Sequence, residues 1–169
     1  MFTLKRNVLA ISQTVEQAHH VVGVWQTVIE KALYSTGSDG TLLTRYKQAL
    51  ADMTDSADRS LVEQLGTDWL TTINQENFHE FLEEVREWLA RVPTFVVYVP
   101  VELDDTGIGI LHEWVRAEVG EEWLLELRVT ANVLGGCAFI KDDHYHDYSL
   151  HGQLRKNPEM IAEIFSTYE

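Results

Sequence analysis

The chain has 169 residues, of which 45% are hydrophobic and 24% charged, which is ordinary for a globular protein and excludes a disordered or collagen-like chain. It has 13 Lys and Arg residues against 27 Asp and Glu residues, and the net charge of −14 argues against nucleic acid and anionic lipid as main ligands, because their phosphates would be repelled. The single cysteine allows neither an intrachain disulfide nor a cysteine-based zinc site.

Residues 4–35 carry apolar side chains at alternating intervals of four and three residues, which predicts one long helix. The repeat consists of Leu4, Val8, Ile11, Val15, Ala18, Val22, Trp25, Ile29 and Ala32. Leu9, Val21 and Val28 widen the apolar stripe beyond the seam of a two-helix coiled coil. We therefore expect a core helix of a bundle, and a helical adaptor that forms a coiled-coil dimer is the alternative.

The segment after this helix alternates between short apolar helical patterns and polar turns. Ser35–Thr41 is a turn with two glycines, and helical patterns follow at 42–53, 56–66, 67–73 and 78–89. Thr54, Asp55 and Ser56 offer a cap for the second of these patterns, Thr67 can cap the next, and Asn77 precedes the last. Residues 1–92 are thus predicted to form an all-helical bundle of about five helices.

At Val92-Pro93 the composition changes from helical to strand-like. Residues 94–103 are rich in β-branched and aromatic side chains, which predicts a strand, and Asp104-Asp105-Thr106 offers a cap for a helix that ends at Gly120. Further strands are predicted at 125–129, at 137–140 after Gly135-Gly136, and at 144–150, with a last helix after Asn157-Pro158. Residues 93–169 therefore form a β-α-β-β-β-α module, and the fold class is α+β.

Acidic and histidine side chains cluster between the last two predicted strands. They are Asp142, Asp143, His144, His146, Asp147 and His151. In a strand, His144 and His146 share one face, which suits a shared metal ion. A small metal-dependent enzyme built on the His144/His146 hairpin is therefore an alternative function, although an exposed polar hairpin explains the same residues.

Two further patterns give weaker indications of chemistry. Gly107-Ile-Gly109 opens a helix after a strand, but His112 stands where a dinucleotide fingerprint has its third glycine, and the acids ahead of the loop repel anions. Cys137, with His112 or His151 as a base, is a conceivable nucleophile, but a lone cysteine in an apolar strand is usually a buried small residue. We expect no catalytic residues, no cofactor and no metal.

The order of segments over residues 94–156 resembles the C-terminal part of the ATP synthase delta subunit family, called OSCP in mitochondria. Strand, helix and strand are followed by a Leu134-Gly135-Gly136 turn, another strand, and an Asp-x-Ser-x-x-Gly-x-Leu motif. The motif residues here are Asp147, Ser149, Gly152 and Leu154. The N-terminal part agrees with the family's bundle in class and size, although the family has six helices there.

The resemblance implies a non-catalytic peripheral-stalk (stator) subunit, which links the F1 head to the membrane-anchored stalk of a rotary, proton-translocating ATP synthase. The bundle would bind the alpha subunits and the C-terminal module the b-subunit helices. The protein would be peripheral on the cytoplasmic face of the bacterial inner membrane, or on its organellar equivalent, and would contact the membrane only through the complex. From the residues themselves, we expect a positive φ or a close backbone approach at Gly135-Gly136, and backbone hydrogen bonds from Asp147 and Ser149.

Overall fold

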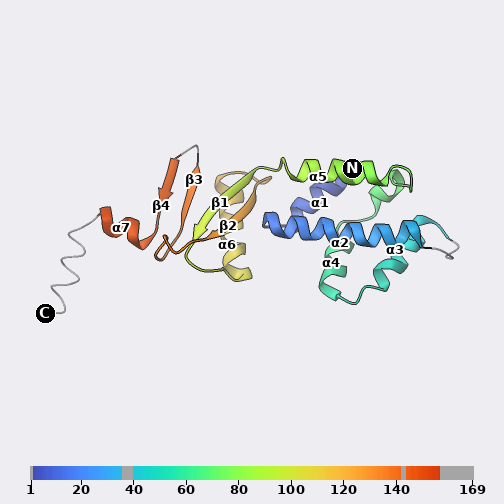
Figure 1. Ribbon diagram of the computed structural model, residues 1–169, viewed down its shortest axis with the longest axis horizontal. Helices are drawn as coiled ribbons and strands as arrows, with labels where there is room; N and C mark the ends of the chain where they lie inside the picture. Colours follow the sequence, from blue (N-terminus) through green and yellow to red (C-terminus); the bar gives the residue numbers. More distant parts are fainter. Residues whose placement is uncertain (1, 36–39, 142–143, 157–169) are drawn as a thin grey trace. The chain divides into compact units, whose positions relative to one another are not determined.

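The computed structural model describes residues 2–35, 40–141 and 144–156. The chain divides into two compact units, Met1–Pro93 and Thr94–Glu169 (Figure 1). The first unit is helical, and the second combines helices with a small sheet, so the predicted α+β fold class is confirmed.

The described part of the first unit has five α-helices and one 3-10 helix. They are α1 (Phe2–Ile11), α2 (Val15–Tyr34), α3 (Leu42–Ala51), α4 (Ser56–Gln64), the 3-10 helix η1 (Asp68–Thr72) and α5 (Phe78–Leu89). Of the turn predicted at Ser35–Thr41, residues 36–39 lie outside the described residues.

The prediction of one helix over residues 4–35 is wrong, because the chain breaks between α1 and α2. Thr14 is the N-cap of α2, and its hydroxyl accepts a hydrogen bond from the Gln17 N–H at 3.1 Å. The Gln17 side chain in turn accepts from the N–H groups of Gln13 at 2.8 Å and Thr14 at 3.4 Å. This capping box satisfies backbone donors that a continuous helix would bond internally. The apolar repeat continues across the break because both helices contribute buried side chains.

Aromatic side chains from distant helices meet in the core of the first unit. The rings of Trp25 and Trp69 are in edge contact with centroids 5.3 Å apart, and Tyr46 contacts Trp69 at 5.4 Å. All three residues are buried. Burial raises the pKa of Tyr46 well above its ordinary range, so this hydroxyl stays protonated. Such edge-to-face pairs fix the packing of α2, α3 and η1.

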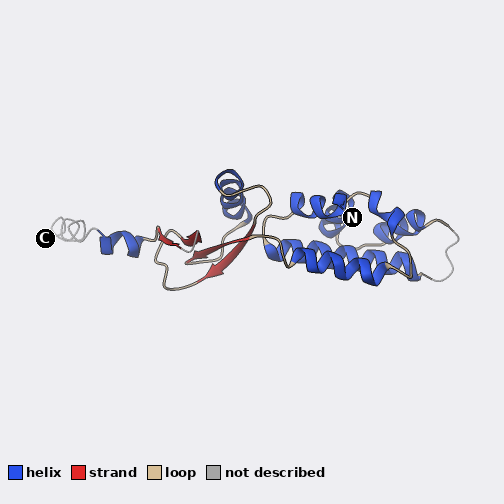
Figure 2. Cartoon of the chain, turned by 90° about the horizontal axis from the view of Figure 1, so that it is seen from above, coloured by secondary structure: helices blue, strands red, loops and turns tan. Residues whose placement is uncertain are grey.

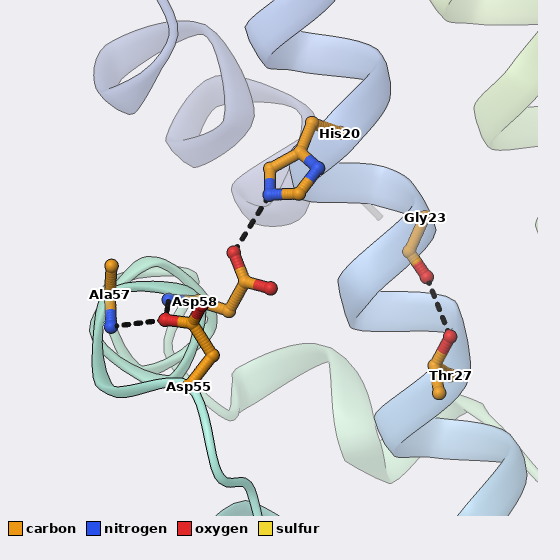
Figure 3. Close-up of polar contacts among 6 residues, drawn as sticks. All are labelled: His20, Gly23, Thr27, Asp55, Ala57 and Asp58. Atoms are coloured by element: carbon orange, nitrogen blue, oxygen red, sulfur yellow. Dashed lines mark hydrogen bonds and ion pairs between the residues drawn. The ribbon is translucent and has the colours of Figure 1, made fainter.

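The predicted caps give a mixed outcome. Asp55 caps α4, and its carboxylate accepts hydrogen bonds from the N–H groups of Ala57 at 2.8 Å and Asp58 at 3.1 Å (Figure 3). Thr67 makes no side-chain cap bond, so that prediction is wrong. Asn77, which precedes α5, makes none either. The Asn77 side chain instead accepts from the Asn74 N–H at 2.8 Å, which closes the turn before α5.

The second unit contains one four-stranded sheet and two helices among its described residues. The elements are β1 (Thr94–Val99), α6 (Asp105–Glu118), β2 (Leu124–Val129), β3 (Ala138–Lys141), β4 (His144–Asp147) and α7 (Leu150–Lys156). The strand order is β2-β1-β3-β4, in which β1 pairs parallel with β2 and antiparallel with β3, and β3 pairs antiparallel with β4. The parallel pair requires a crossover, and α6 provides it.

Helix α6 lies against one face of this sheet (Figures 1 and 2). Buried side chains of that face form the core, namely Phe95, Val97, Val99, Leu125 and Phe139, with Val115 of α6. The opposite face carries the alternate residues of each strand, and Ile140 and Tyr145 are exposed there.

Two strand predictions were too long. The first strand ends at Val99 rather than residue 103, because Pro100 has no N–H to continue the ladder. The strand at 144–150 ends at Asp147, and α7 begins at Leu150 instead. The helix predicted after Asn157-Pro158 lies outside the described residues.

Candidate functional site

The two parts of the predicted motif meet in the second unit. The Leu150 N–H, at the start of α7, donates to the carbonyl oxygens of Leu134 at 2.9 Å and Gly135 at 3.0 Å. The Tyr148 N–H donates to the Cys137 carbonyl at 3.0 Å. We call this hydrogen-bonded meeting point of residues 134–137 and 147–152 the motif junction.

The glycine turn takes the conformation expected of it. Gly135 has φ +64° and Gly136 has φ +74°, which side chains with a Cβ rarely adopt. A Cβ on Gly136 would overlap the Tyr148 carbonyl oxygen, whereas one on Gly135 would make an ordinary 3.5 Å contact with the Leu150 Cβ. The expected positive φ and close backbone approach are both confirmed, and Gly136 is the more constrained position.

The expected backbone hydrogen bonds of Asp147 and Ser149 are also confirmed. The Asp147 carboxylate accepts from the Ser149 N–H at 2.9 Å, and the buried Ser149 hydroxyl accepts from the Gly152 N–H at 2.9 Å. Hydrogen bonds from Ser149 lower the pKa of the Asp147 carboxyl, so it stays ionised. A Cβ on Gly152 would overlap this carboxylate. Leu154 belongs to α7, but its side chain is outside the described part of the chain.

An apolar groove lies between α6 and the β1–β3 part of the sheet, next to the motif junction. Its volume is about 390 Å³, and its lining residues are Val97, Leu111, Trp114, Cys137, Phe139 and Tyr148. The aromatic lining residues pack together. Measured between ring centroids, the Phe139 ring lies 5.5 Å from the Trp114 ring and stacks on the Tyr148 ring at 5.6 Å. The Phe139 ring also stacks on the His146 ring at 5.1 Å. Cys137 and Tyr148 belong both to the groove and to the junction.

Further exposed apolar side chains belong to the motif junction and to α6. Leu134 and Leu150, which the junction joins, are exposed, as are Trp114 and Ile110 on α6. Residues four apart lie on the same side of a helix, so Ile110 extends the Trp114 side of the groove. We call the groove and these neighbours the apolar surface. Exposed apolar surface of this kind is typical of interaction sites and ligand-binding grooves.

Sequence reasoning missed this surface. Trp114 stands at core spacing on its helix, which gives no sign that its side chain is exposed in the fold. The groove becomes visible only when α6 and β3 are placed side by side.

The predicted metal-ligand cluster is only partly described. Asp142 and Asp143 lie outside the described residues. Of the others, His146 stacks on Phe139 and Asp147 accepts from Ser149. Within residues 2–35, 40–141 and 144–156, no group of three or more His, Cys, Asp or Glu side chains could hold a metal ion.

The remaining candidates are Cys137, His112 and the Gly107-Ile-Gly109 segment. Burial raises the pKa of the Cys137 thiol, which opposes thiolate formation. His112 is buried on α6. The start of α6 is already occupied, because the carboxylate of its N-cap Asp104 accepts from the Gly107 N–H at 2.8 Å. That carboxylate leaves no place for a phosphate there.

Comparison with known proteins adds no assignment. Neither the scan against protein-family models nor the search of curated proteins found a match. None of the helices in the described ranges combines the length and apolar composition that a membrane crossing requires. The site is therefore defined by its own geometry: a rigid motif junction beside an apolar surface.

Proposed function

We propose that this protein is a non-catalytic stator subunit, which links the F1 head of a rotary, proton-translocating ATP synthase to its membrane-anchored peripheral stalk. One observation carries the proposal. The Leu134-Gly135-Gly136 turn and the Asp147–Gly152 motif, which the resemblance selected from the sequence, join in one hydrogen-bonded junction. The residues that match the family pattern are thus in direct contact with one another in the folded chain.

The helical unit adds support. The sequence predicted about five helices, with residues 67–73 among them, where the resembled family has six. The break at Ser12–Thr14 raises the number of described helical segments in residues 2–93 to six, one of which is the 3-10 helix. This number of segments is compatible with the resembled family.

The work of such a subunit is to bind and to resist torque, which needs affinity and stiffness rather than reactive side chains. An apolar surface supplies binding, and a junction with two positive-φ glycines and five internal hydrogen bonds supplies a rigid support. In this proposal the helical unit binds the alpha subunits and the second unit binds b-subunit helices. No cofactor takes part, and the protein is peripheral on the cytoplasmic face of the bacterial inner membrane or its organellar equivalent.

Purification of the complex tests the proposal. The tagged full-length chain, expressed in its source organism, is purified from membranes solubilised in mild detergent. The expected result is stoichiometric recovery of the alpha, beta and b subunits, identified by mass spectrometry. An intact ATP synthase that contains a different delta subunit and lacks this chain would refute the proposal.

A further inference from the structure

We propose that the apolar surface of the second unit binds one amphipathic helix whose polar flanks are basic. This inference rests on the proposed function, because it names the chemistry of a partner and the place where that partner sits. The surface consists of the groove lined by Trp114, Cys137, Phe139 and Tyr148, together with exposed Ile110, Leu134 and Leu150.

The composition of the groove fits anchoring side chains of a partner protein. Trp and Tyr are enriched among the residues that dominate binding energy, since they offer large apolar area with few torsions to fix. Trp114 and Tyr148 are both exposed at the groove, and Phe139 forms its buried floor. An open apolar surface beside a helix suits the apolar stripe of a second helix, with anchors at i, i+3, i+4 and i+7.

The acidic charge of the second unit favours basic residues at the flanks of that helix. Residues 94–169 contain five Lys or Arg residues against 14 Asp or Glu residues. Glu118 stands four residues after Trp114, so it lies on the groove side of α6, and it is exposed, as is Glu113. Lys and Arg beside the apolar stripe would be attracted to this unit, whereas an acidic flank would be repelled.

The same charges argue against the chain's own C-terminal end as the occupant. Residues 157–169 contain apolar residues at helical spacing, but also Glu159, Glu163 and Glu169 and no basic residue. An acidic segment on an acidic unit is disfavoured, so the partner is a separate, basic helix.

Fluorescence anisotropy with labelled peptides tests the inference on the full-length chain. Three peptides of about 20 residues are compared: the C-terminal segment of the b subunit from the same genome, a designed helix with a Leu stripe and Lys flanks, and the same design with Glu flanks. We expect the two basic peptides to bind. The Glu-flanked peptide should bind at least about tenfold more weakly, which corresponds to about 1.4 kcal/mol.

Two tyrosines of similar exposure give a matched pair of variants. Tyr148 is 56% exposed and lines the groove, whereas Tyr145 is 59% exposed and lies on the opposite face, because its neighbour His146 stacks on Phe139. Tyr148→Ala should weaken binding about 30-fold, the effect of a hot-spot residue of about 2 kcal/mol. Tyr145→Ala should leave the affinity within about twofold of the wild type.

The single cysteine provides a readout that does not depend on a substitution. Cys137 is the only cysteine of the chain and lines the groove, so a bound helix should slow its alkylation by iodoacetamide. The raised pKa of this thiol slows the reaction in the free protein, so the assay is run near pH 9 with and without peptide.

The outcomes separate this inference from the proposed function. If the designed basic helix binds and protects Cys137 but the b-subunit peptide does not bind, the groove inference stands and the stator proposal fails. If the b-subunit peptide binds without protecting Cys137 and without sensitivity to Tyr148→Ala, the groove inference is wrong while the stator proposal stands. If no basic peptide binds, or if the Glu-flanked helix binds equally well, the inference is overturned.

Discussion

Replacing Gly136 by alanine should destabilise the second unit much more than the same change at Gly135. Both glycines have positive φ, which costs a residue with a Cβ about 1–2 kcal/mol. At Gly135 that is the main cost, because the new Cβ would make only an ordinary 3.5 Å contact with the Leu150 Cβ. At Gly136 the new Cβ would overlap the Tyr148 carbonyl oxygen.

Relief of that overlap requires the β3 start and the Tyr148 backbone to separate. This motion would break the hydrogen bond between the Tyr148 N–H and the Cys137 carbonyl, now 3.0 Å long, at a cost of about 1 kcal/mol. We therefore expect about 1–2 kcal/mol for Gly135→Ala and about 3 kcal/mol or more for Gly136→Ala. Gly136→Val should be at least as damaging.

The assay is hydrogen exchange across a urea series, read by mass spectrometry on peptides from each unit. In Gly136→Ala, peptides from residues 94–156 should lose protection at lower urea, while peptides from residues 2–93 should be unchanged. Equal costs for the two alanine variants would refute the argument from the Tyr148 contact. Equal loss of protection in both units would show that they unfold as one.

Three further predictions concern single side chains. Gly23→Ala should raise the free energy of unfolding by about 0.5–1 kcal/mol in urea titration, because alanine favours a helix interior over glycine. Gly23 is exposed inside α2 (Figure 3), and a Cβ there would meet nothing within 4 Å. A loss of stability would contradict this reasoning. Trp69→Phe should lower the free energy of unfolding by about 1 kcal/mol more than Trp25→Phe, measured by thermal unfolding. Trp69 Nε1 donates to the Leu65 carbonyl at 3.2 Å, whereas Trp25 Nε1 has no partner within the described residues. Equal losses of stability would count against this reasoning. Burial lowers the pKa of His112 below its ordinary 6.5, and the Arg116 charge adds to this effect while Glu113 opposes it. Because the unfolded chain therefore takes up the proton first, the second unit should lose stability as the pH falls below about 6.5. His112→Gln should remove that part of the pH dependence in urea titrations at pH 7.5 and 5.5, and an unchanged slope would refute it.

Exposed polar contacts are expected to matter little. His20 Nε2 lies 2.7 Å from Asp58 Oδ1 between α2 and α4, but the His20 side chain is largely solvent-exposed (Figure 3). An exposed pair of this kind contributes about 0–1 kcal/mol. The stability of the helical unit therefore rests on its aromatic core.

The α+β class could be predicted because each segment's periodicity and composition agree with its final structure. The break in the first helix could not be predicted from the apolar repeat, since α1 and α2 bury side chains at the same spacing on either side of it. The relevant signal was Thr14-x-x-Gln17, a capping-box pattern inside an apparently continuous stripe. Likewise, Pro100 marked the end of β1 more reliably than the β-branched composition that continues to residue 103.

The candidate site, like the fold, could be predicted only in part from the sequence. The glycines, Asp147 and Ser149 could be selected from the sequence because their roles are local: turn conformation and backbone hydrogen bonds. The groove could not, because Trp114 and Tyr148 are distant in sequence and meet only through the packing of α6 on β3 and the path of the chain after β4. Exposure distinguishes these two aromatic residues from core residues, and exposure is a property of the folded chain.

Sedimentation velocity on a mixture of three components tests the central claim most directly. The full-length chain is combined with the N-terminal segment of the alpha subunit and the C-terminal segment of the b subunit from the same genome, each carrying a different fluorophore. The stator account predicts one sedimenting species that contains both fluorophores, and with Gly136→Ala a species that keeps the alpha segment and loses the b segment. Binding of neither segment, or binding of one that excludes the other, would contradict the claim that this chain links the two parts of the enzyme.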